Sequence, residues 1–339
     1  MIKVGIWGYG GIAAVHRRAY AVLEEAGVPV KLVSLCDIRP EQFTREIKIN
    51  ISDKNSKPLP KIEKCYTDID EMMANEELDM IDICLPAYLH ADAAIKALNM
   101  GYHVMSEKPM ALNHKESERM LEAAASAKGE FMVGHCVRFN PYYAYLKNAV
   151  ENGSYGKVVS ASFQRLSSPP LWSWNNWYMD VKKSGGVKLD LHIHDIDAIN
   201  YIFGMPDTIS CIANSKEGLS GIDSVFTTMK FNNTIINIIG DWSFPSSFSF
   251  DASYRVSFEK GTLTYNSTDG LYFYDDEKRT KIDCQSNMHN IAYEIKYFVE
   301  TIENSEKNII NPPLSSANTI KIEDAMTESL LHNGKIVKI

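Results

Sequence analysis

The sequence has few of the features that mark secreted, membrane or nucleic-acid-binding proteins. Its six cysteines form no Cys-x-x-Cys pair, and Cys36 and Cys84 lie in short apolar runs, which favours buried thiols in a reducing compartment. No apolar run is long enough to span a bilayer, and the first one starts at Ile2, so we expect no membrane segment and no signal peptide. The net charge of −8 argues against nucleic acid and anionic membranes as partners. These observations indicate a cytoplasmic protein, and 339 residues suffice for two domains.

A short apolar strand at the N-terminus leads directly into a glycine-rich turn. Residues 2–7 form the predicted strand, and Gly8-Tyr9-Gly10-Gly11-Ile12-Ala13 follows in the pattern G-x-G-x-x-A. In dinucleotide-binding folds the first glycine permits the tight turn, the second admits the pyrophosphate, and the last small residue packs the helix on the strand. A helix over about residues 13–26 would direct its free amide groups at the phosphates. The predicted cofactor contacts here are Gly8, Tyr9, Gly10, Gly11 and Ile12.

A second strand, residues 31–36, ends in an acidic residue. The carboxylate of Asp37 is placed to accept hydrogen bonds from the adenosine ribose and would repel a 2′-phosphate, so we predict NAD as the cofactor. Arg39 supports NADP as the less favoured alternative, because a nearby arginine can accommodate that phosphate. Asp37, Ile38 and Arg39 are therefore further predicted cofactor contacts.

Lys108 follows an apolar run that ends in Tyr102-His103-Val104-Met105. A lysine at the end of such a strand lies at the carboxyl edge, where open α/β sheets bind ligands. Pro109 restricts Lys108 to an extended backbone, which fixes the direction of the ammonium group. Taken alone, a solvated lysine at a strand end would be the more common arrangement, so the case for Lys108 depends on the other motifs.

Strand and helix patterns alternate up to about residue 136 and then change character. The predicted strands are 80–85, 102–108 and 131–134, the predicted helices are 90–99 and 114–128, and the polar stretch 49–64 is predicted to be an exposed insertion. This alternation predicts a parallel sheet with helices on both faces. Beyond it, helices are expected at about 141–152, 288–304 and 315–331, with strand patterns at 156–163 and from 208 to 282. We therefore predict an α/β fold with a dinucleotide-binding domain, residues 1–136, and an α+β domain with an antiparallel sheet, residues 137–339.

The densest polar cluster runs from Ser184 to Asp197, and its local structure is ambiguous. Its apolar residues alternate as in a strand between 189 and 193, but they recur as in a helix between 193 and 199. In either geometry a carboxylate, such as that of Asp190 in the helix, lies beside His194. A neighbouring carboxylate favours the charged imidazole and orients the ring, as a general base near neutral pH requires.

Two other interpretations of this cluster remain open. His194 could be a structural histidine bonded to a neighbouring carboxylate, with no chemistry. A metal site built from His192, His194 and Asp195 is disfavoured, because no further ligand cluster appears and the two histidines point apart in a helix. We therefore predict no metal.

The segment from Trp172 to Tyr178 holds three of the five tryptophans of the chain. Aromatic faces with N–H and O–H groups suit the apolar faces and hydroxyls of sugars. Trp174 and Trp177 are therefore candidate substrate contacts. An anchor for a long loop, or a contact between subunits, is the equally weighted alternative.

Taken together, these motifs resemble the Gfo/Idh/MocA family of oxidoreductases, which includes inositol and glucose–fructose dehydrogenases. The resemblance runs through the glycine turn, Leu85-Pro86-Ala87-Tyr88-Leu89-His90, Glu107-Lys108-Pro109, Val133-Gly134-His135-Cys136-Val137-Arg138-Phe139-Asn140-Pro141, and Gly185-Gly186 followed by Asp190, His194 and Asp197. Cys136 departs from the family pattern, in which a polar residue is common.

The resemblance implies a Rossmann domain and a C-terminal α+β domain whose open, mainly antiparallel sheet carries subunit contacts, hence a homodimer or homotetramer. It favours the helical form of residues 190–197. It implies that Lys108, Asp190 and His194 are catalytic and face the substrate. The further contacts that it implies are Leu85, Pro86, His90, Glu107 and Lys108 for the cofactor, and Arg138 for the substrate.

Three functions are compatible with these motifs. The favoured one is an NAD-dependent dehydrogenase that oxidises a secondary hydroxyl of a sugar, an inositol or a sugar derivative, with His194 accepting the proton and Lys108 stabilising the alkoxide. The second is an NAD-requiring glycosidase with no net redox change, and the third is a non-enzymatic NAD-binding regulator. An intact Lys108, Asp190 and His194 argues against the third.

Overall fold

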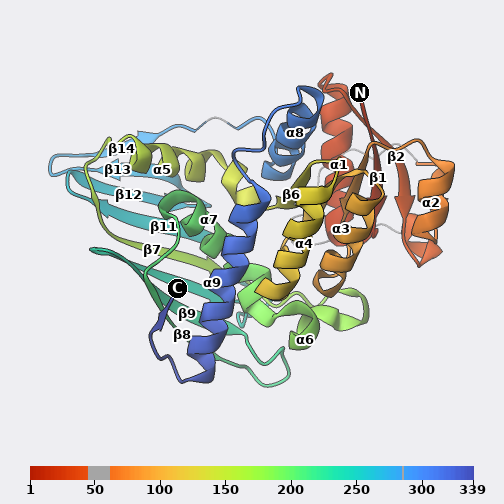
Figure 1. Cartoon of the computed structure of the whole chain (residues 1–339). Helices are drawn as coiled ribbons and strands as arrows, with labels where there is room; N and C mark the ends of the chain where they lie inside the picture. The colour runs from red at the N-terminus through yellow and green to blue at the C-terminus, as the bar shows by residue number, and fades with distance from the viewer. Residues whose placement is uncertain (45–61, 285) are drawn as a thin grey trace.

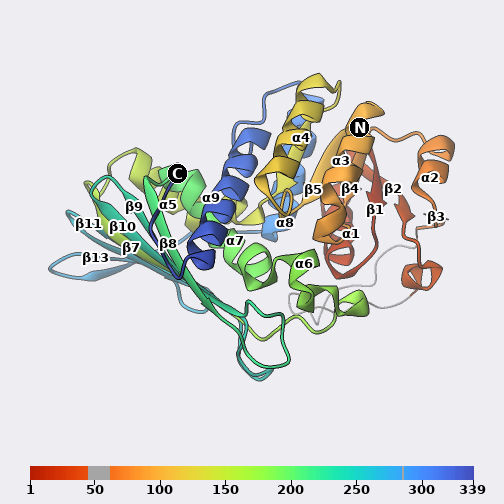
Figure 2. The same cartoon turned by 60° about the horizontal axis from the view of Figure 1, so that its bottom comes forward.

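The computed structural model describes residues 1–44, 62–284 and 286–339, and most of the predicted insertion at 49–64 lies outside them. The chain forms two sheets side by side, with the long helix α9 (Pro313–Leu331) between them in both views (Figures 1 and 2). The predicted cofactor turn follows a strand of the first sheet, and residues of the second sheet line the cavity beside that turn.

The first sheet is fully parallel and has the strand order β3-β2-β1-β4-β5-β6. Its strands are β1 (Ile2–Trp7), β2 (Val30–Cys36), β3 (Lys64–Tyr66), β4 (Met80–Ile83), β5 (His103–Glu107) and β6 (Phe131–Gly134). The order reverses between β1 and β4, so a crevice opens at their carboxyl ends, where such sheets bind ligands. The helices are α1 (Gly11–Glu25), α2 (Ile69–Asn75), α3 (His90–Asn99) and α4 (His114–Ser126).

Helix α8 (Asn290–Glu303) comes from the C-terminal part of the chain but packs on the first sheet. Its Ile295 and Phe298 are buried in one cluster with Val4 of β1 and Leu23 of α1. Figure 1 shows α8 beside α1. The division at residue 136 stays a prediction, and α8 shows that later residues also cover the nucleotide-binding sheet.

The second sheet is mixed and mainly antiparallel, with β7 and β10 as its parallel pair. Its order is β14-β13-β12-β11-β7-β10-β9-β8-β15. The strands are β7 (Val158–Leu166), β8 (Thr208–Asn214), β9 (Ser224–Phe231), β10 (Thr234–Asp241), β11 (Asp251–Phe258), β12 (Gly261–Asn266), β13 (Gly270–Tyr274), β14 (Arg279–Ile282) and β15 (Val337–Lys338). Helices α5 (Pro141–Glu151), α7 (Ile193–Phe203) and α9 cover one face, and their apolar residues share a core with alternate strand residues such as Val225 and Ile236.

The predicted fold class is confirmed: a Rossmann sheet is followed by an α+β region with a mainly antiparallel sheet. The sequence did not predict β3, α2 and β15, which are short and have weak periodicity. No disulfide joins any of the six cysteines, all of which lie in the described ranges. Across the described ranges, no helix combines the length and the apolar character that crossing a membrane would demand.

Candidate active site

The glycine turn lies at the carboxyl end of β1 and opens onto a cavity. Gly8 has φ +92°, and a Cβ there would come within 2.8 Å of the Cys84 carbonyl oxygen, so the turn requires glycine. A Cβ on Gly10 would meet no atom within 4 Å, so the backbone there is open to a bound group. Ala13 is fully buried where α1 packs on the sheet. This open cradle at the start of α1 fits a dinucleotide pyrophosphate.

Asp37 lies at the end of β2 and is held on both of its oxygens. Oδ2 accepts a hydrogen bond from the Tyr9 backbone amide at 2.8 Å. Arg39 donates to Oδ1 from its backbone amide and Nε, at 2.9 and 3.0 Å, and to Oδ2 from Nη2 at 3.2 Å. The guanidinium also stacks over Trp174, 4.9 Å from the ring centroid. Because Arg39 is tied to the carboxylate, its charge is shared with Asp37 instead of being free for a 2′-phosphate.

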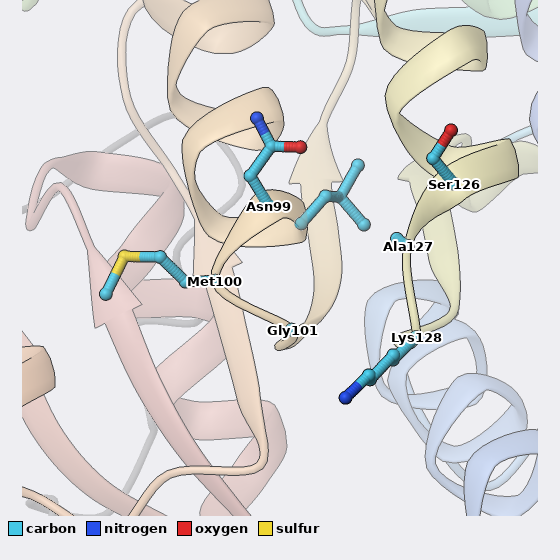
Figure 3. A pocket seen from close by; sticks show the side chains of 7 residues that line it. Asn99, Met100, Gly101, Ser126, Ala127 and Lys128 are labelled. Atoms are coloured by element: carbon cyan, nitrogen blue, oxygen red, sulfur yellow. The ribbon is translucent and has the colours of Figure 1, made fainter.

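A cavity of about 1220 Å³ joins this turn to the second sheet. All but one of the predicted site residues line it: Gly8, Tyr9, Gly10, Gly11, Ile12, Asp37, Ile38, Arg39, Leu85, Pro86, His90, Glu107, Lys108, Trp174, Trp177, Asp190 and His194. A second hollow, of about 230 Å³, lies at the opposite edge of the first sheet, between the ends of α3 and α4. Figure 3 shows that its labelled side chains do not converge, and no carboxylate or histidine lines it. The larger cavity is therefore the candidate active site.

Lys108 and Asp190 form the central ion pair of the cavity. Lys108 Nζ donates to Oδ1 of Asp190 and to its backbone oxygen, each at 2.7 Å. Asp190 lies in a π-helical turn, η5 (Lys188–His192), which continues into α7, so the helical form of this segment is the observed one. An ammonium group has three donors, so one N–H of Lys108 remains for another acceptor.

The structure corrects the predicted pairing of Asp190 with His194. The Asp190 carboxylate binds Lys108, and no carboxylate in the described ranges lies within ion-pair distance of the His194 ring. Burial, then the positive charges of Lys108 and Arg165, hold the pKa of His194 well below 6.5. Nδ1 of His194 is buried without a hydrogen-bond partner in the described structure. The ring is therefore neutral at neutral pH, which is the opposite of the predicted charge stabilisation.

Below Lys108 lies a buried charged cluster that the sequence did not predict. His16 of α1 contacts Asp82 through Nδ1 at 2.8 Å and Glu107 through Nε2 at 2.9 Å, and Tyr20 donates to Asp82 at 2.9 Å. Burial lowers the pKa of His16, but the Asp82 carboxylate outweighs it and raises that pKa well above 6.5. The second oxygen of Glu107 accepts the Lys108 backbone amide at 3.1 Å. Glu107 thus fixes the backbone that carries Lys108.

Two predicted residues have mainly structural contacts. The His90 ring lies between the carbonyl oxygens of Leu85 and Pro109, at 2.8 and 2.7 Å, and so ties together two loops of the cavity wall. Arg138 does not line the cavity. Its nitrogens bind Asp197, the Ile310 carbonyl and Ser315, so we withdraw it from the substrate site. The His135-Cys136-Val137-Arg138 motif had suggested it, but η3 (Cys136–Phe139) turns the side chain into the core.

Arg165 and Tyr178 are among the residues that line the cavity but were not predicted. Arg165 of β7 binds Asp195, and Tyr178 has the pKa of its phenol raised well above 10 by burial and by the nearby charges of Asp190 and Glu107. Trp177 stacks on Tyr178 with ring centroids 4.0 Å apart. The aromatic segment signalled Tyr178, whereas nothing local marks Arg165.

The three residues of the disfavoured metal interpretation do not converge. His192 contacts the Thr227 hydroxyl at 3.0 Å and Asp195 binds Arg165, so neither is turned toward His194. Among the described residues, the side chains whose possible ligand atoms lie close enough together for one metal ion are those of His16, Asp82 and Cys84. That histidine is already committed to two carboxylates.

Two family models match most of the chain. One, described as an oxidoreductase family with an NAD-binding Rossmann fold, matches residues 2–135, and the other, the GFO/IDH/MocA C-terminal domain, matches residues 143–264. The chain belongs to the Gfo/Idh/MocA family. It is an oxidoreductase of this family, and its cofactor is NAD. The glycine turn and Asp37 are the residues that would hold NAD, and their geometry fits it.

Relatives in the Gfo/Idh/MocA family differ in the reactions that their names describe. The myo-inositol 2-dehydrogenase of Thermotoga maritima is 27% identical over 270 residues, which cover 77% of this chain and 74% of that protein. The 2,7-anhydro-N-acetylneuraminate hydratase of Mediterraneibacter gnavus is 26% identical over 241 residues, 68% of this chain and 63% of that protein. The structure of levoglucosan dehydrogenase with NADH and levoglucosan has a TM-score of 0.84 at 19% identity, covering 100% of this chain and 99% of that one.

Proposed function

We propose that this protein transfers hydride between a secondary hydroxyl of a polyhydroxylated small molecule and NAD. The observation that carries the proposal is the Lys108–Asp190 pair, held at 2.7 Å beside His194 in the same cavity as the glycine turn. When bound, NAD supplies the hydride acceptor. The side chains of the cavity then have to fix the hydroxyl and remove its proton.

Lys108 is proposed to hold the reacting oxygen. Two of its N–H groups are fixed on Asp190, so the third has a defined direction in the cavity. The substrate oxygen gains negative charge as the proton leaves, and a preorganised cation stabilises that charge more than it stabilises the neutral hydroxyl. Asp190 is proposed to act through Lys108, as the group that positions it.

His194 is proposed to accept the proton. Its ring lines the cavity and is neutral, so an imidazole nitrogen is available as an acceptor. Trp177 and Tyr178 form a stacked aromatic pair in the lining of the same cavity, which suits the apolar face of a sugar or inositol ring.

The test is NADH formation from NAD across a panel of sugars, inositols and glycosides, with product analysis in parallel. Net NADH with a ketone product supports the proposal. Cleavage or hydration of the substrate without net NADH would contradict the proposal and indicate a reaction with no net redox change. Hydration is the reaction that the name of one relative describes. Tight NAD binding with no turnover of any substrate would instead indicate a non-enzymatic NAD-binding regulator.

We also propose a cytoplasmic homo-oligomer. Ile212, Phe226 and Ile235 project from the face of the second sheet opposite its helices, and each is about half exposed, at 56, 44 and 49%. An exposed apolar face of this kind is typical of subunit contacts. Sedimentation velocity checks this, with Phe226→Lys expected to shift the protein toward monomer.

A further inference from the structure

Arg138 and Arg165 form nearly identical ion pairs with aspartates of α7, but the hydrogen bonding of one nitrogen, Nη1, differs between them. Arg138 binds Asp197 through Nε and Nη2, at 2.8 and 2.7 Å, and its Nη1 donates to the Ile310 carbonyl at 2.9 Å. Arg165 binds Asp195 through Nε and Nη2, at 3.0 and 2.9 Å. Its Nη1 makes no hydrogen bond to any described residue. All three nitrogens of Arg138 therefore donate hydrogen bonds, whereas in Arg165 only Nε and Nη2 donate to described residues.

The location of the two side chains accounts for the difference. Arg138 is buried in the core, whereas Arg165 lines the cavity together with Lys108 and His194. Nη1 of Arg165 is also not one of the buried polar atoms that lack a partner, so it has access to open space. Because Arg165 is only 6% exposed, that space is the cavity. Bonds to Asp195, and from Nη2 to the Tyr143 hydroxyl at 3.3 Å, fix the direction of the guanidinium.

Arg165 contributes to a positive field at the part of the cavity that His194 lines. Burial lowers the pKa of Arg165, but Asp195 outweighs it and keeps the guanidinium charged. At the neighbouring His194 ring, the charges that act most strongly are those of Lys108 and Arg165, and both disfavour a further cation. The carboxylates of Asp190 and Asp195 are bound to these two cations. The Coulomb interaction of this field with an anion is stronger than its interaction with a neutral hydroxyl.

We propose that the substrate carries a carboxylate, as in a sugar acid, and that Nη1 of Arg165 donates a hydrogen bond to it. The proposal rests on the proposed function, since it names the substrate class of the same cavity. It places the carboxylate at Arg165 and the reacting hydroxyl at Lys108. A planar guanidinium with two fixed nitrogens presents its third without further loss of side-chain freedom, which favours tight recognition.

The test compares matched pairs of ligands that differ in one group, D-glucose with D-glucuronate and D-galactose with D-galacturonate. Binding to the protein–NADH complex is measured from NADH fluorescence, and kcat/KM is measured from NADH formation. We expect the acid of at least one pair to bind about 10- to 100-fold more tightly than its neutral partner, since a hydrogen bond to a charged group is worth that much.

The variant Arg165→Gln with Asp195→Asn removes both charges and leaves no buried carboxylate unpaired. It should lose the preference for the acid and change the affinity for the neutral partner much less. Arg138→Gln with Asp197→Asn is the matched control, which should lower the melting temperature and keep the preference. If the first double variant fails to fold, Arg165→Lys takes its place, with a loss of several-fold in acid preference expected.

Two results would overturn the proposal: no acid binding more tightly than its neutral partner, or a preference that survives in the Arg165 variants. The proposed function fails separately. If acids bind through Arg165 but no substrate yields NADH, the result supports the anion site and contradicts hydride transfer to NAD. If neutral polyols alone are oxidised, with no effect of Arg165, hydride transfer stands and the anion site falls.

Discussion

Replacing Lys108 by methionine tests whether its ammonium group stabilises the reacting oxygen. Methionine keeps most of the stem, but it removes both hydrogen bonds to Asp190 and the N–H left for the substrate. Loss of one donor that acts in the transition state costs about 10²–10³ in kcat. Lys108 and Asp190 are 14% and 18% exposed, so the unpaired carboxylate can still reach water, and the fold should survive.

Lys188 provides the matched control for this experiment. Its Nζ also binds one residue twice, through the Glu323 carboxylate at 2.9 Å and the Glu323 carbonyl at 3.2 Å, but it does not line the cavity. Lys188→Met should lower the melting temperature, because a buried carboxyl loses its partner, and leave kcat of the folded protein unchanged.

The assay is steady-state NADH formation, with NAD affinity measured in parallel. Asp190→Asn keeps an oxygen acceptor and removes the charge, so a loss of about 5- to 10-fold is expected, the difference between a charged and a neutral hydrogen bond. In the double variant the Asp190 change should add nothing to Lys108→Met, because Asp190 acts through the lysine. Wild-type turnover in Lys108→Met, or losses that multiply in the double variant, would refute the reasoning.

Three further predictions concern the pH profile, the cofactor and the turn. Because the pKa of His194 is held well below 6.5, kcat/KM for oxidation should stay flat above that pH and fall only below it, as the ring gains a proton. His194→Gln should remove this ionisation and cost about 10²–10⁴ in rate, and an ionisation above pH 6.5 that disappears in the variant would contradict the structure. NAD should be preferred to NADP in kcat/KM, and Asp37→Ser should reduce that preference about tenfold; an equal or greater value for NADP in the unaltered protein would mean that Arg39 dominates the pocket. Gly8→Ala should lower the melting temperature, because its Cβ meets a backbone oxygen at 2.8 Å, whereas Gly10→Val should keep the melting temperature and weaken NAD binding, measured by titration.

The cofactor half of the site could be predicted because its signals are local. The turn, Asp37 and Lys108 each directly follow a strand, and parallel strands bring their carboxyl ends to one edge. The buried cluster of His16, Asp82 and Glu107 was missed because its contacts join residues far apart in sequence. Asp82 is a carboxylate within an apolar strand, which was the available signal, but its partner His16 is 66 residues away in sequence.

The substrate half depended on contacts that the sequence does not encode locally. Arg138 and Arg165 have the same chemistry, and Asp195 and Asp197 lie two residues apart on one helix. Only the packing of β7 and η3 against α7 decides which arginine reaches the cavity. The family motif drew attention to Arg138, and the structure favours Arg165.

The observed pairing of Asp190 with Lys108 changes which residue the Asp190 carboxylate supports in the proposed proton transfer. With Asp190 on His194, the carboxylate would have helped the ring to hold a proton. With Asp190 on Lys108, the ring lies near two cations and accepts a proton less readily. In the proposed function Lys108 also stabilises the alkoxide, so the cation that weakens the base favours loss of the proton from the substrate oxygen. In the proposed function, the electrostatic stabilisation of the substrate oxygen therefore compensates for the weak basicity of His194. The Lys108 variant is for that reason expected to affect kcat directly, and Asp190 only through Lys108.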